Sequence, residues 1–214
     1  MIVERIKSLF VIGLSLTTLG IVGCNKERVQ AEQNPTLQSE TPSVITSETP
    51  KADVPYVPTA NEVVEKMLKM AKVSSNDIVY DLGSGDGRIP IAAVKQYNAL
   101  KATGVEINPD LVKKSQDNAK KAGVSDKVKF LQQDLFQTNL SDATVVTLYL
   151  LPEVNLKLRP KLLRELKPGT RIVSHAFDMG DWKPDSVEQV KDKTGRSYTL
   201  YQWTVPENVP ENLL

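Results

Sequence analysis

Residues 81–88 of this chain read Asp-Leu-Gly-Ser-Gly-Asp-Gly-Arg, and they follow directly on the apolar run Ile78, Val79 and Tyr80. Glycines at such a point let the backbone turn sharply and approach a ligand closely. A second apolar run ends at Glu106, where a carboxylate can accept hydrogen bonds from ribose hydroxyls. Together these features predict a β-α-β unit that binds a ligand containing a nucleoside.

The spacing of the glycines distinguishes between two kinds of cofactor. Gly83, Gly85 and Gly87 follow a G-x-G-x-G pattern, and Arg88 stands where the dinucleotide fingerprint has its last glycine. This pattern argues against NAD. It favours S-adenosylmethionine, whose methionine portion would lie against the glycine loop.

Length and composition limit what the chain can be. Its 214 residues correspond to one ordinary domain, and a hydrophobic content of 40% is enough to fill a core. The 27 basic and 26 acidic residues give a net charge of +1, so no overall field favours nucleic acid as a partner. With one Cys and one His, no metal site and no internal disulfide are predicted.

The N-terminus predicts a targeting segment. The apolar stretch over residues 9–22 has the length of a signal-peptide core and is shorter than the roughly 20 residues that span a bilayer. Residues 21–24 read Ile-Val-Gly-Cys and resemble the lipobox of bacterial lipoproteins, which implies a lipid-modified Cys24. We therefore expect a signal peptide over residues 1–23 and a membrane-anchored lipoprotein on the extracytoplasmic face. The alternative is an uncleaved short anchor, or an overextended start with a chance cysteine.

Two regions of different composition follow. Residues 24–53 are rich in Ser, Thr, Glu, Gln and Pro and are too polar to bury a core, so we expect a disordered linker. Residues 54–214 are the globular part. It begins with a helix that Thr59 can cap, because apolar residues then recur every three or four positions.

Strand and helix patterns alternate along the globular part. The predicted strands cover residues 77–82, 102–106, 128–132, 143–150 and 170–174, followed by an antiparallel pair at 186–190 and 197–204. The predicted helices between them cover residues 89–97, 111–122 and 152–166. This alternation predicts an α/β fold, a Rossmann-like three-layer sandwich. We expect a mostly parallel seven-stranded sheet that ends in an antiparallel hairpin.

Three segments resemble a particular branch of the class I methyltransferases. They are residues 55–59 (Pro-Tyr-Val-Pro-Thr), residues 80–88 and residues 106–109 (Glu-Ile-Asn-Pro). They are similar to the protein lysine methyltransferases that act on the mitochondrial ATP-synthase c-subunit and the adenine nucleotide translocase, and to their prokaryotic relatives. The resemblance covers residues 54–203. It implies that residues 54–214 are a class I methyltransferase domain, with S-adenosylmethionine as cofactor and a protein lysine as acceptor.

Three carboxylates stand where predicted strands end, and the ends of parallel strands meet at the ligand-binding edge of such a sheet. Asp81 is expected to anchor the glycine loop or to face the amino group of the methionine portion. Glu106 would accept both ribose hydroxyls, and Asp134 would accept from the adenine amine. A solvent-exposed strand end for Glu106, and a cap for the segment after Asp134, are the simpler alternatives.

In the family that the chain resembles, the proline-aromatic element lies over the cofactor, which implies that Pro55, Tyr56 and Thr59 help to close the site. A hydrophobic staple ahead of the first helix is an equally good interpretation of Tyr56. The predicted cofactor-binding residues are Tyr56, Thr59, Asp81, Gly83, Ser84, Gly85, Asp86, Gly87, Glu106, Asn108, Asp134 and Leu135.

The segment after the fourth strand is where methyltransferases position the methyl acceptor. Tyr149 and Pro152 are the candidate acceptor-site residues, although an aromatic strand residue is more often part of the core. The sequence there lacks the Asn-Pro-Pro-aromatic signature of enzymes that methylate amino groups of DNA and glutamine, which lowers the expectation of nucleobase methylation. His175 follows the fifth strand and could contact the substrate, although a lone His is more often structural. No general base is assigned, because methyl transfer from a sulfonium depends mainly on geometry.

Three interpretations of the function remain open. The favoured one is an S-adenosylmethionine-dependent methyltransferase that acts on protein lysines. The second keeps the cofactor but has a small molecule or RNA as acceptor. The third is a non-catalytic, membrane-anchored module that binds a nucleoside. It is motivated by the lipobox, which directs the chain out of the cytoplasm while S-adenosylmethionine is made inside.

Overall fold

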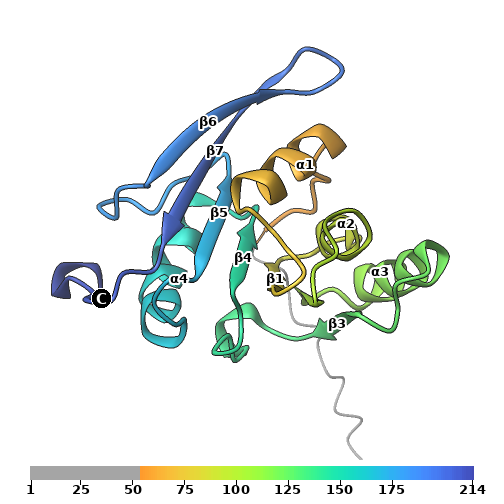
Figure 1. Ribbon diagram of the computed structural model, residues 1–214, viewed down its shortest axis with the longest axis horizontal. Coiled ribbons are helices and arrows are strands. Elements are labelled where there is room, and N and C mark those ends of the chain that lie inside the picture. Colours follow the sequence, from red (N-terminus) through yellow and green to blue (C-terminus); the bar gives the residue numbers. More distant parts are fainter. Residues whose placement is uncertain (1–53) are drawn as a thin grey trace, which may run out of the picture. The chain divides into compact units, whose positions relative to one another are not determined.

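A mixed sheet runs through residues 54–214, the part of the chain that the computed structural model describes. Its seven strands are β1 (Ile78–Leu82), β2 (Lys101–Glu106), β3 (Val128–Gln132), β4 (Val145–Leu148), β5 (Arg171–His175), β6 (Ser186–Lys191) and β7 (Ser197–Thr204). They follow the order β3-β2-β1-β4-β5-β7-β6 (Figure 1). Neighbours from β3 to β5 are parallel, and β7 is antiparallel to β5 and β6. The expected mostly parallel sheet with an antiparallel end hairpin is confirmed.

The helices lie between the strands as the alternating pattern predicts. They are α1 (Asn61–Met70), α2 (Arg88–Tyr97), α3 (Pro109–Ala122) and α4 (Pro152–Glu165), with the 3-10 turns η1 (Leu135–Gln137) and η2 (Glu211–Leu213). No helix within residues 54–214 combines the length and the apolar character needed to cross a bilayer. The predicted signal peptide (1–23), the predicted linker (24–53) and the proposed lipidation site Cys24 lie outside the described residues.

Local capping chemistry sets the start of α3 but not that of α1. Asn108 accepts hydrogen bonds from the backbone N–H groups of Asp110 (2.9 Å) and Leu111 (3.4 Å), and Pro109 occupies the first helical position. The prediction that Thr59 caps the first helix is wrong. The N-cap of α1 is Ala60, without a side-chain hydrogen bond, and the Thr59 hydroxyl lies against His175 of β5 instead.

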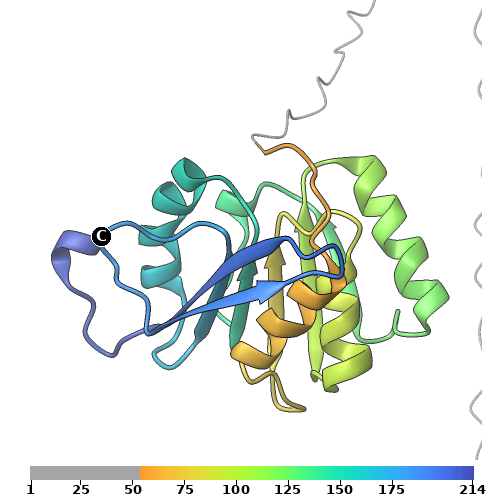
Figure 2. The ribbon, with the colours of Figure 1, turned by 90° about the horizontal axis from the view of Figure 1, so that it is seen from above.

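The helices divide between the two faces of the sheet (Figure 2). α1, α2 and α3 pack on one face around a buried cluster that includes Met67 and Ala93. α4 packs on the other face around a second cluster that includes Leu158, Ile172 and Trp203. Burial of apolar side chains on both faces is the main stabilising contribution in such a three-layer fold.

The second face carries less helix than the first. Within the described residues, η1 is the helical element between β3 and β4, and β5 is joined to β6 through residues 176–185 without a helix. Trp182 from that loop packs against Trp203 of β7 with ring centroids 5.9 Å apart, and Trp203 Nε1 donates to the Trp182 carbonyl (2.8 Å). The indole pair therefore covers sheet surface that a crossover helix would otherwise bury.

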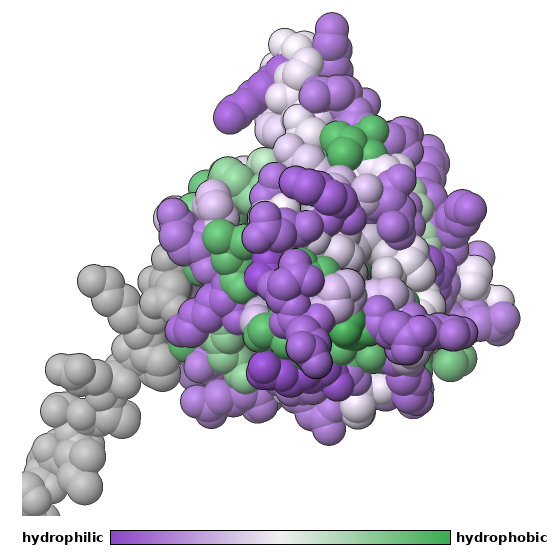
Figure 3. Space-filling view, turned by 90° about the vertical axis from the view of Figure 1, so that its left-hand side faces the viewer, coloured by the Kyte–Doolittle hydropathy of each residue, from purple (hydrophilic) through white to green (hydrophobic). Residues whose placement is uncertain are grey.

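One outer face of the protein is mostly hydrophilic. Figure 3 views the left-hand side of Figure 1 and shows hydrophobic residues scattered among polar and charged ones. Isolated apolar residues are normal on a protein surface and need no partner to cover them.

A carboxylate ties the strands together at the edge where β1, β4 and β5 begin. Asp77 accepts hydrogen bonds from the Ser74 backbone N–H and the Thr144 hydroxyl, each at 2.7 Å, and forms an ion pair with Arg171. Burial raises the pKa of Asp77, but the hydrogen bonds and the charge of Arg171 outweigh it and hold that pKa below its ordinary value. The ionised carboxylate therefore stabilises the fold at neutral pH, and the contribution is lost as the pH falls through the lowered pKa.

Gly87, the N-cap of α2, is required by packing as well as by its backbone conformation. Its φ is +78°, and an added Cβ would lie 2.4 Å from the Phe130 ring and 2.8 Å from Ser115 Cβ. We expect Gly87→Ala to lower the free energy of unfolding by about 3 kcal/mol, measured by urea denaturation without cofactor. Gly123→Ala is the matched control, because Gly123 has a φ of +73° but no atom within 4 Å of an added Cβ. It should cost about 1 kcal/mol; equal losses in the two variants would refute the packing argument.

Candidate functional site

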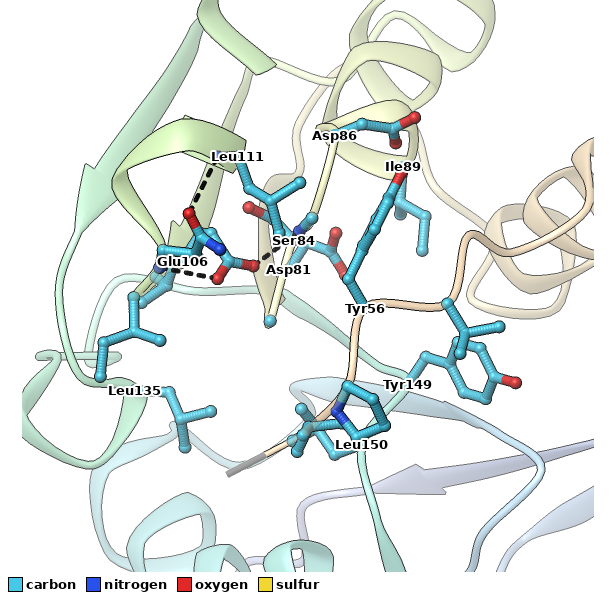
Figure 4. Close-up of a pocket in the computed structure, with 18 of the residues that line it drawn as sticks. Tyr56, Asp81, Ser84, Asp86, Ile89, Glu106, Leu111, Leu135, Tyr149 and Leu150 are labelled. Atoms are coloured by element: carbon cyan, nitrogen blue, oxygen red, sulfur yellow. Dashed lines mark hydrogen bonds between the residues drawn. The ribbon is translucent and has the colours of Figure 1, made fainter. Parts of the chain in front are cut away.

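A pocket opens at the edge of the sheet where β1, β2 and β4 end (Figure 4). Its walls come from the segments that follow these strands and β3, and from residues 54–59, which precede α1. We call residues 54–59 the strap. The predicted location at the carboxyl ends of parallel strands agrees with this pocket.

Most of the predicted site residues are brought together here. Those that line the pocket are Tyr56, Thr59, Asp81, Gly83, Ser84, Gly85, Asp86, Glu106, Asn108, Asp134, Leu135 and Tyr149. Two predicted residues do not line it. Gly87 packs beneath Phe130 and begins α2, and Pro152 is exposed in the first turn of α4. Gly87 therefore serves the packing of the loop rather than the surface of the pocket.

Glu106 shapes the glycine loop. Its Oε2 accepts from the backbone N–H of Gly85 and its Oε1 from that of Asn108, both at 2.9 Å (Figure 4). The N–H groups of Gly83 and Ser84 donate to the Val105 carbonyl at 2.9 and 3.0 Å. Each carboxylate oxygen has a second lone pair, so Glu106 can still accept from a ligand. The alternative of a solvent-exposed Glu106 is wrong, since the residue is 8% exposed.

Asp81 is buried below the glycine loop. The Thr147 hydroxyl donates to Asp81 Oδ1 at 2.7 Å. Burial is the largest cause that raises the pKa of Asp81, the charges of Glu106 and Asp86 add to the rise, and the hydrogen bond from Thr147 opposes it; together they place the pKa at about 7. Asp81 is therefore near its titration midpoint at neutral pH, and a cation in the pocket would favour its ionised form.

Asp86 and Arg88 form a bidentate pair at the rim. Arg88 Nε donates to Asp86 Oδ1 at 2.9 Å, and Nη2 donates to Oδ2 at 2.6 Å. Burial raises the pKa of Asp86, but the hydrogen bonds and charge of Arg88 outweigh it, so the pKa of Asp86 lies below its ordinary value. Asp86 is thus an ionised but paired carboxylate.

Asp134 does what the simpler alternative predicted. Its Oδ1 accepts from the backbone N–H of Phe136 at 2.8 Å and so caps η1. Asp134 also lines the pocket, together with Leu135 and Phe136. Lys157 Nζ lies 4.3 Å from the centroid of the Phe136 ring. This end of the pocket therefore combines the polar side chains of Gln133 and Asp134 with the apolar side chains of Leu135 and Phe136.

Tyr56 lies on the glycine loop. An added Cβ on Gly85 would lie 2.6 Å from Tyr56 Cε2, so the ring is in close contact with the backbone of the loop (Figure 4). Lys114 Nζ stands 5.4 Å from the centre of the same ring. These contacts favour a cover over the pocket and not a hydrophobic staple on α1, because the ring is directed toward the loop after β1.

Tyr149 and His175 join the pocket to the interior. Tyr149 lines the pocket and stacks on His175, with ring centroids 3.8 Å apart and planes at 28°. Tyr198 meets the other side of the imidazole edge-on at 5.1 Å. Burial and, to a smaller extent, the charge of Arg196 together lower the pKa of His175 to about 4. His175 is thus neutral at pH 7 and buried, in agreement with the structural role expected for it.

Several site residues were missed by the sequence reasoning. Thr147 acts through Asp81, 66 positions away, and no local pattern marks it. Arg88 was noted only as part of the glycine motif, and its contact with the Thr59 carbonyl, 29 positions away, could not be seen in the sequence. Leu150, Val154 and Phe136 form apolar walls of the pocket. They look like ordinary core residues in the sequence, so only the fold reveals that they face a ligand.

Comparisons with known proteins agree on the type of enzyme. A model of the ANTKMT methyltransferase domain matches residues 81–186. A protein-lysine N-methyltransferase from Saccharolobus islandicus (strain REY15A) is 48% identical over 155 residues, which are 72% of this chain and 96% of that protein. The human ATP synthase c-subunit lysine N-methyltransferase is 37% identical over 137 residues, 64% of this chain. This chain spans only 58% of the human protein's length.

A solved structure is similar over nearly all of its length. It is described as an RNA methyltransferase from Salinibacter ruber in complex with S-adenosyl-L-homocysteine. The two chains share 56% identity with a TM-score of 0.68, and the match covers 74% of this chain and 99% of the other. The names of the relatives thus agree on methyl transfer and differ on the acceptor.

The ionisation of Asp81 predicts how cofactor binding depends on pH. A cationic ligand favours the charged carboxylate, so affinity for S-adenosylmethionine should rise by severalfold between about pH 6 and about pH 8. Asp81→Asn keeps the acceptor for Thr147 and should weaken binding and remove this dependence. Calorimetric titration at several pH values tests both statements, and an Asp81→Asn variant with an unchanged profile would contradict them.

The same substitution should stabilise the protein without ligand. The pKa of Asp81 is raised from 3.8 to about 7 on folding, so the folded state loses stability as the pH rises through that interval. Asp81→Asn removes the cost of a buried charge, and at about pH 8 the gain should be on the order of 2 kcal/mol. Thermal denaturation at about pH 5 and pH 8 provides the comparison, because the gain should be largest at the higher pH.

Proposed function

Since the chain belongs to the ANTKMT methyltransferase family and is an S-adenosylmethionine-dependent methyltransferase, we propose that it methylates the side-chain amine of a protein lysine. The observation that carries this proposal is the 48% identity to the Saccharolobus protein-lysine N-methyltransferase, over 96% of that protein. The human relative's name points to the same acceptor class. The form of the pocket supports the proposal in two ways.

The donor set of the pocket fits the cofactor. Asp81 and Glu106 bring carboxylates to a ligand that carries a sulfonium and an ammonium group. Ser84 and the glycine loop also line the pocket, so backbone groups of the loop can meet a polar ligand. We assign the methionine portion to the glycine loop and Asp81, the ribose to the remaining lone pairs of Glu106, and the adenine to Asp134 and Leu135.

The wall toward α4 suits an alkylamine. Tyr149, Leu150 and Val154 line this side of the pocket, and Leu150 and Val154 are buried apolar residues. When bound, S-adenosylmethionine supplies a methyl group on a positively charged sulfur. A lysine with a pKa of about 10.4 needs roughly 4.6 kcal/mol to lose its proton at pH 7, and an apolar wall reduces this cost by desolvating the ammonium group. The residues of this wall would orient the amine and exclude water, with no dedicated base.

RNA is the second candidate acceptor. The name of the Salinibacter structure supports it, and Lys114 and Lys157 stand beside aromatic rings that line the pocket. Against it, the net charge of +1 provides no general attraction for a polyanion. The Asn-Pro-Pro-aromatic signature of amino-methylating enzymes is also absent after β4. Protein lysine therefore remains the better-supported acceptor.

We further propose that the enzyme is anchored to a membrane through a lipidated Cys24, on the extracytoplasmic face. The proposal rests on residues 21–24 and on the apolar stretch before them. Residues 24–53 would then act as a tether that sets the reach of the methyltransferase domain. A membrane-bound protein would be an accessible lysine-containing acceptor for such an enzyme.

Transfer of a labelled methyl group tests the acceptor. With S-adenosylmethionine labelled in its methyl group, the full chain should label protein bands of a membrane extract, and the label should map to lysine. Gly85→Val should reduce labelling at least a hundredfold, because φ is +53° and an added Cβ would lie 2.6 Å from the Tyr56 ring. If only RNA or small molecules carry the label, the acceptor is not a protein lysine and the second interpretation holds. Cofactor binding without any labelling would favour the non-catalytic module.

Mass spectrometry of the N-terminal peptide tests the anchor. Cys24 should carry acyl groups and should form the new N-terminus, and Cys24→Ser should abolish both the acyl mass and the cleavage. A fractionated cell lysate should then show the variant outside the membrane pellet. An unmodified Cys24 still joined to Gly23 in the wild-type protein would refute lipidation.

A further inference from the structure

Arg88 stands where a helix disfavours a positive charge. It is the first residue of α2, whose first turn contains no acidic residue and whose N-cap, Gly87, offers no side-chain hydrogen bond. The dipole of a helix disfavours a cation at its N-terminus. Exceptions to local preference of this kind are expected where a side chain serves a site. The hydrogen bonds of Arg88 to Asp86 and to Thr59 suggest such a role.

The guanidinium group of Arg88 links the glycine loop to the strap. The bidentate pair with Asp86 fixes the plane of the group, and the remaining nitrogen, Nη1, donates to the Thr59 carbonyl at 2.6 Å. The Asp86 carbonyl in turn accepts from Asn118 Nδ2 of α3 at 2.9 Å. The group that holds Thr59 is therefore itself fixed to the body of the domain.

The strap is stiff, so a bond at its end positions all of it. Pro55 and Pro58 fix their own φ angles and restrict the residues that precede them to extended conformations. Val54 packs against the core cluster around α4, and Thr59 is 5% exposed. Between these ends, Tyr56 lies against Gly85, directly over the loop that is assigned to the cofactor.

The other side of Thr59 faces the acceptor wall. Its hydroxyl lies 3.4 Å from His175 Nδ1, and the His175 ring stacks on Tyr149. Thr59 is thus the residue at which the strap meets both the glycine loop, through its carbonyl, and the aromatic wall, through its hydroxyl. A shift of the strap would disturb both sides of the pocket.

We propose that Arg88 is a positioning residue that holds the strap closed over the bound cofactor through the carbonyl of Thr59. Without this bond the strap opens more often, and the cofactor leaves the pocket faster. Lysine cannot replace arginine here, because a single ammonium group does not reproduce a planar fork that serves a carboxylate and a carbonyl at once. The inference concerns cofactor retention and is independent of which molecule accepts the methyl group.

The first test measures release of S-adenosylhomocysteine from the full chain by stopped-flow displacement. Arg88→Lys should raise the dissociation rate and the KM for S-adenosylmethionine by about tenfold, with a smaller change in kcat at saturating cofactor. Arg159→Lys is the matched control. Arg159 also donates to two main-chain carbonyls, those of Met179 (2.9 Å) and Leu213 (3.1 Å), but does not line the pocket. Its variant should lose thermal stability and keep the wild-type dissociation rate.

The second test measures opening of the strap by proteolysis. Tyr56 is 41% exposed, so chymotrypsin can cleave the bond between residues 56 and 57 when the strap opens. With S-adenosylhomocysteine saturating both proteins, cleavage at this bond, followed by mass spectrometry, should be severalfold faster in Arg88→Lys than in the wild type. Cleavage elsewhere in residues 60–214 should be unchanged.

Two results would overturn the proposal. One is a wild-type dissociation rate in an Arg88→Lys protein that melts as a single folded species. The other is an equal acceleration in Arg159→Lys, because a general loss of stability would then explain both. A changed dissociation rate without faster cleavage at residue 56 would also count against the strap as the element that Arg88 controls.

Discussion

The hydrogen bonds that Glu106 accepts are the interaction on which the rest of the site depends. β1 and β2 pair in parallel with Leu82 opposite Val105, so their following loops leave the sheet side by side. Glu106 joins these loops by accepting from Gly85 on one and Asn108 on the other. Since its oxygens also face the pocket, one carboxylate both forms the glycine loop and can bind a ligand. The loop is therefore held in shape before a ligand arrives, which lowers the entropic cost of binding.

Asp77 lies just before β1 and Asp81 near its end, and both are buried. Their different surroundings shift their pKa values in opposite directions, so that one stabilises the fold and the other serves the pocket. Asp77 is surrounded by Ser74, Thr144 and Arg171, and its pKa is lowered. Asp81 has one hydroxyl partner, lies near other carboxylates, and has its pKa raised to about 7. The partners of Asp77 stabilise its ionised carboxylate and thereby the folded state. The surroundings of Asp81 destabilise its ionised carboxylate when no ligand is bound. This is expected at a binding site for a cation, because only the ligand can compensate the buried charge.

Features that depend on neighbouring residues could be predicted from the sequence, and features that depend on distant partners could not. The strands follow from apolar runs between breakers, and the start of α3 follows from Asn108 and Pro109, whose effect is local. Thr59 was predicted as a cap from the same kind of rule. Its groups are instead taken by Arg88, 29 positions away, and His175, 116 positions away. Asp81 was found as a strand-end carboxylate, but its partner Thr147 is 66 positions away.

The two sides of the pocket, toward the glycine loop and toward α4, differ in how they are built. The side that we assign to the cofactor combines the backbone of the glycine loop and the proline-containing strap with the carboxylates of Asp81, Glu106 and Asp134. Such a surface can be shared by enzymes with different acceptors, since it recognises only what all of them bind. The side that we assign to the acceptor is formed by side chains, chiefly those of Tyr149, Leu150 and Val154. If this assignment holds, relatives with 48% and 56% identity to this chain can share the cofactor surface and still bear names with different acceptors. The glycine motif therefore identifies the cofactor, and the identity of the acceptor must be sought between β4 and α4.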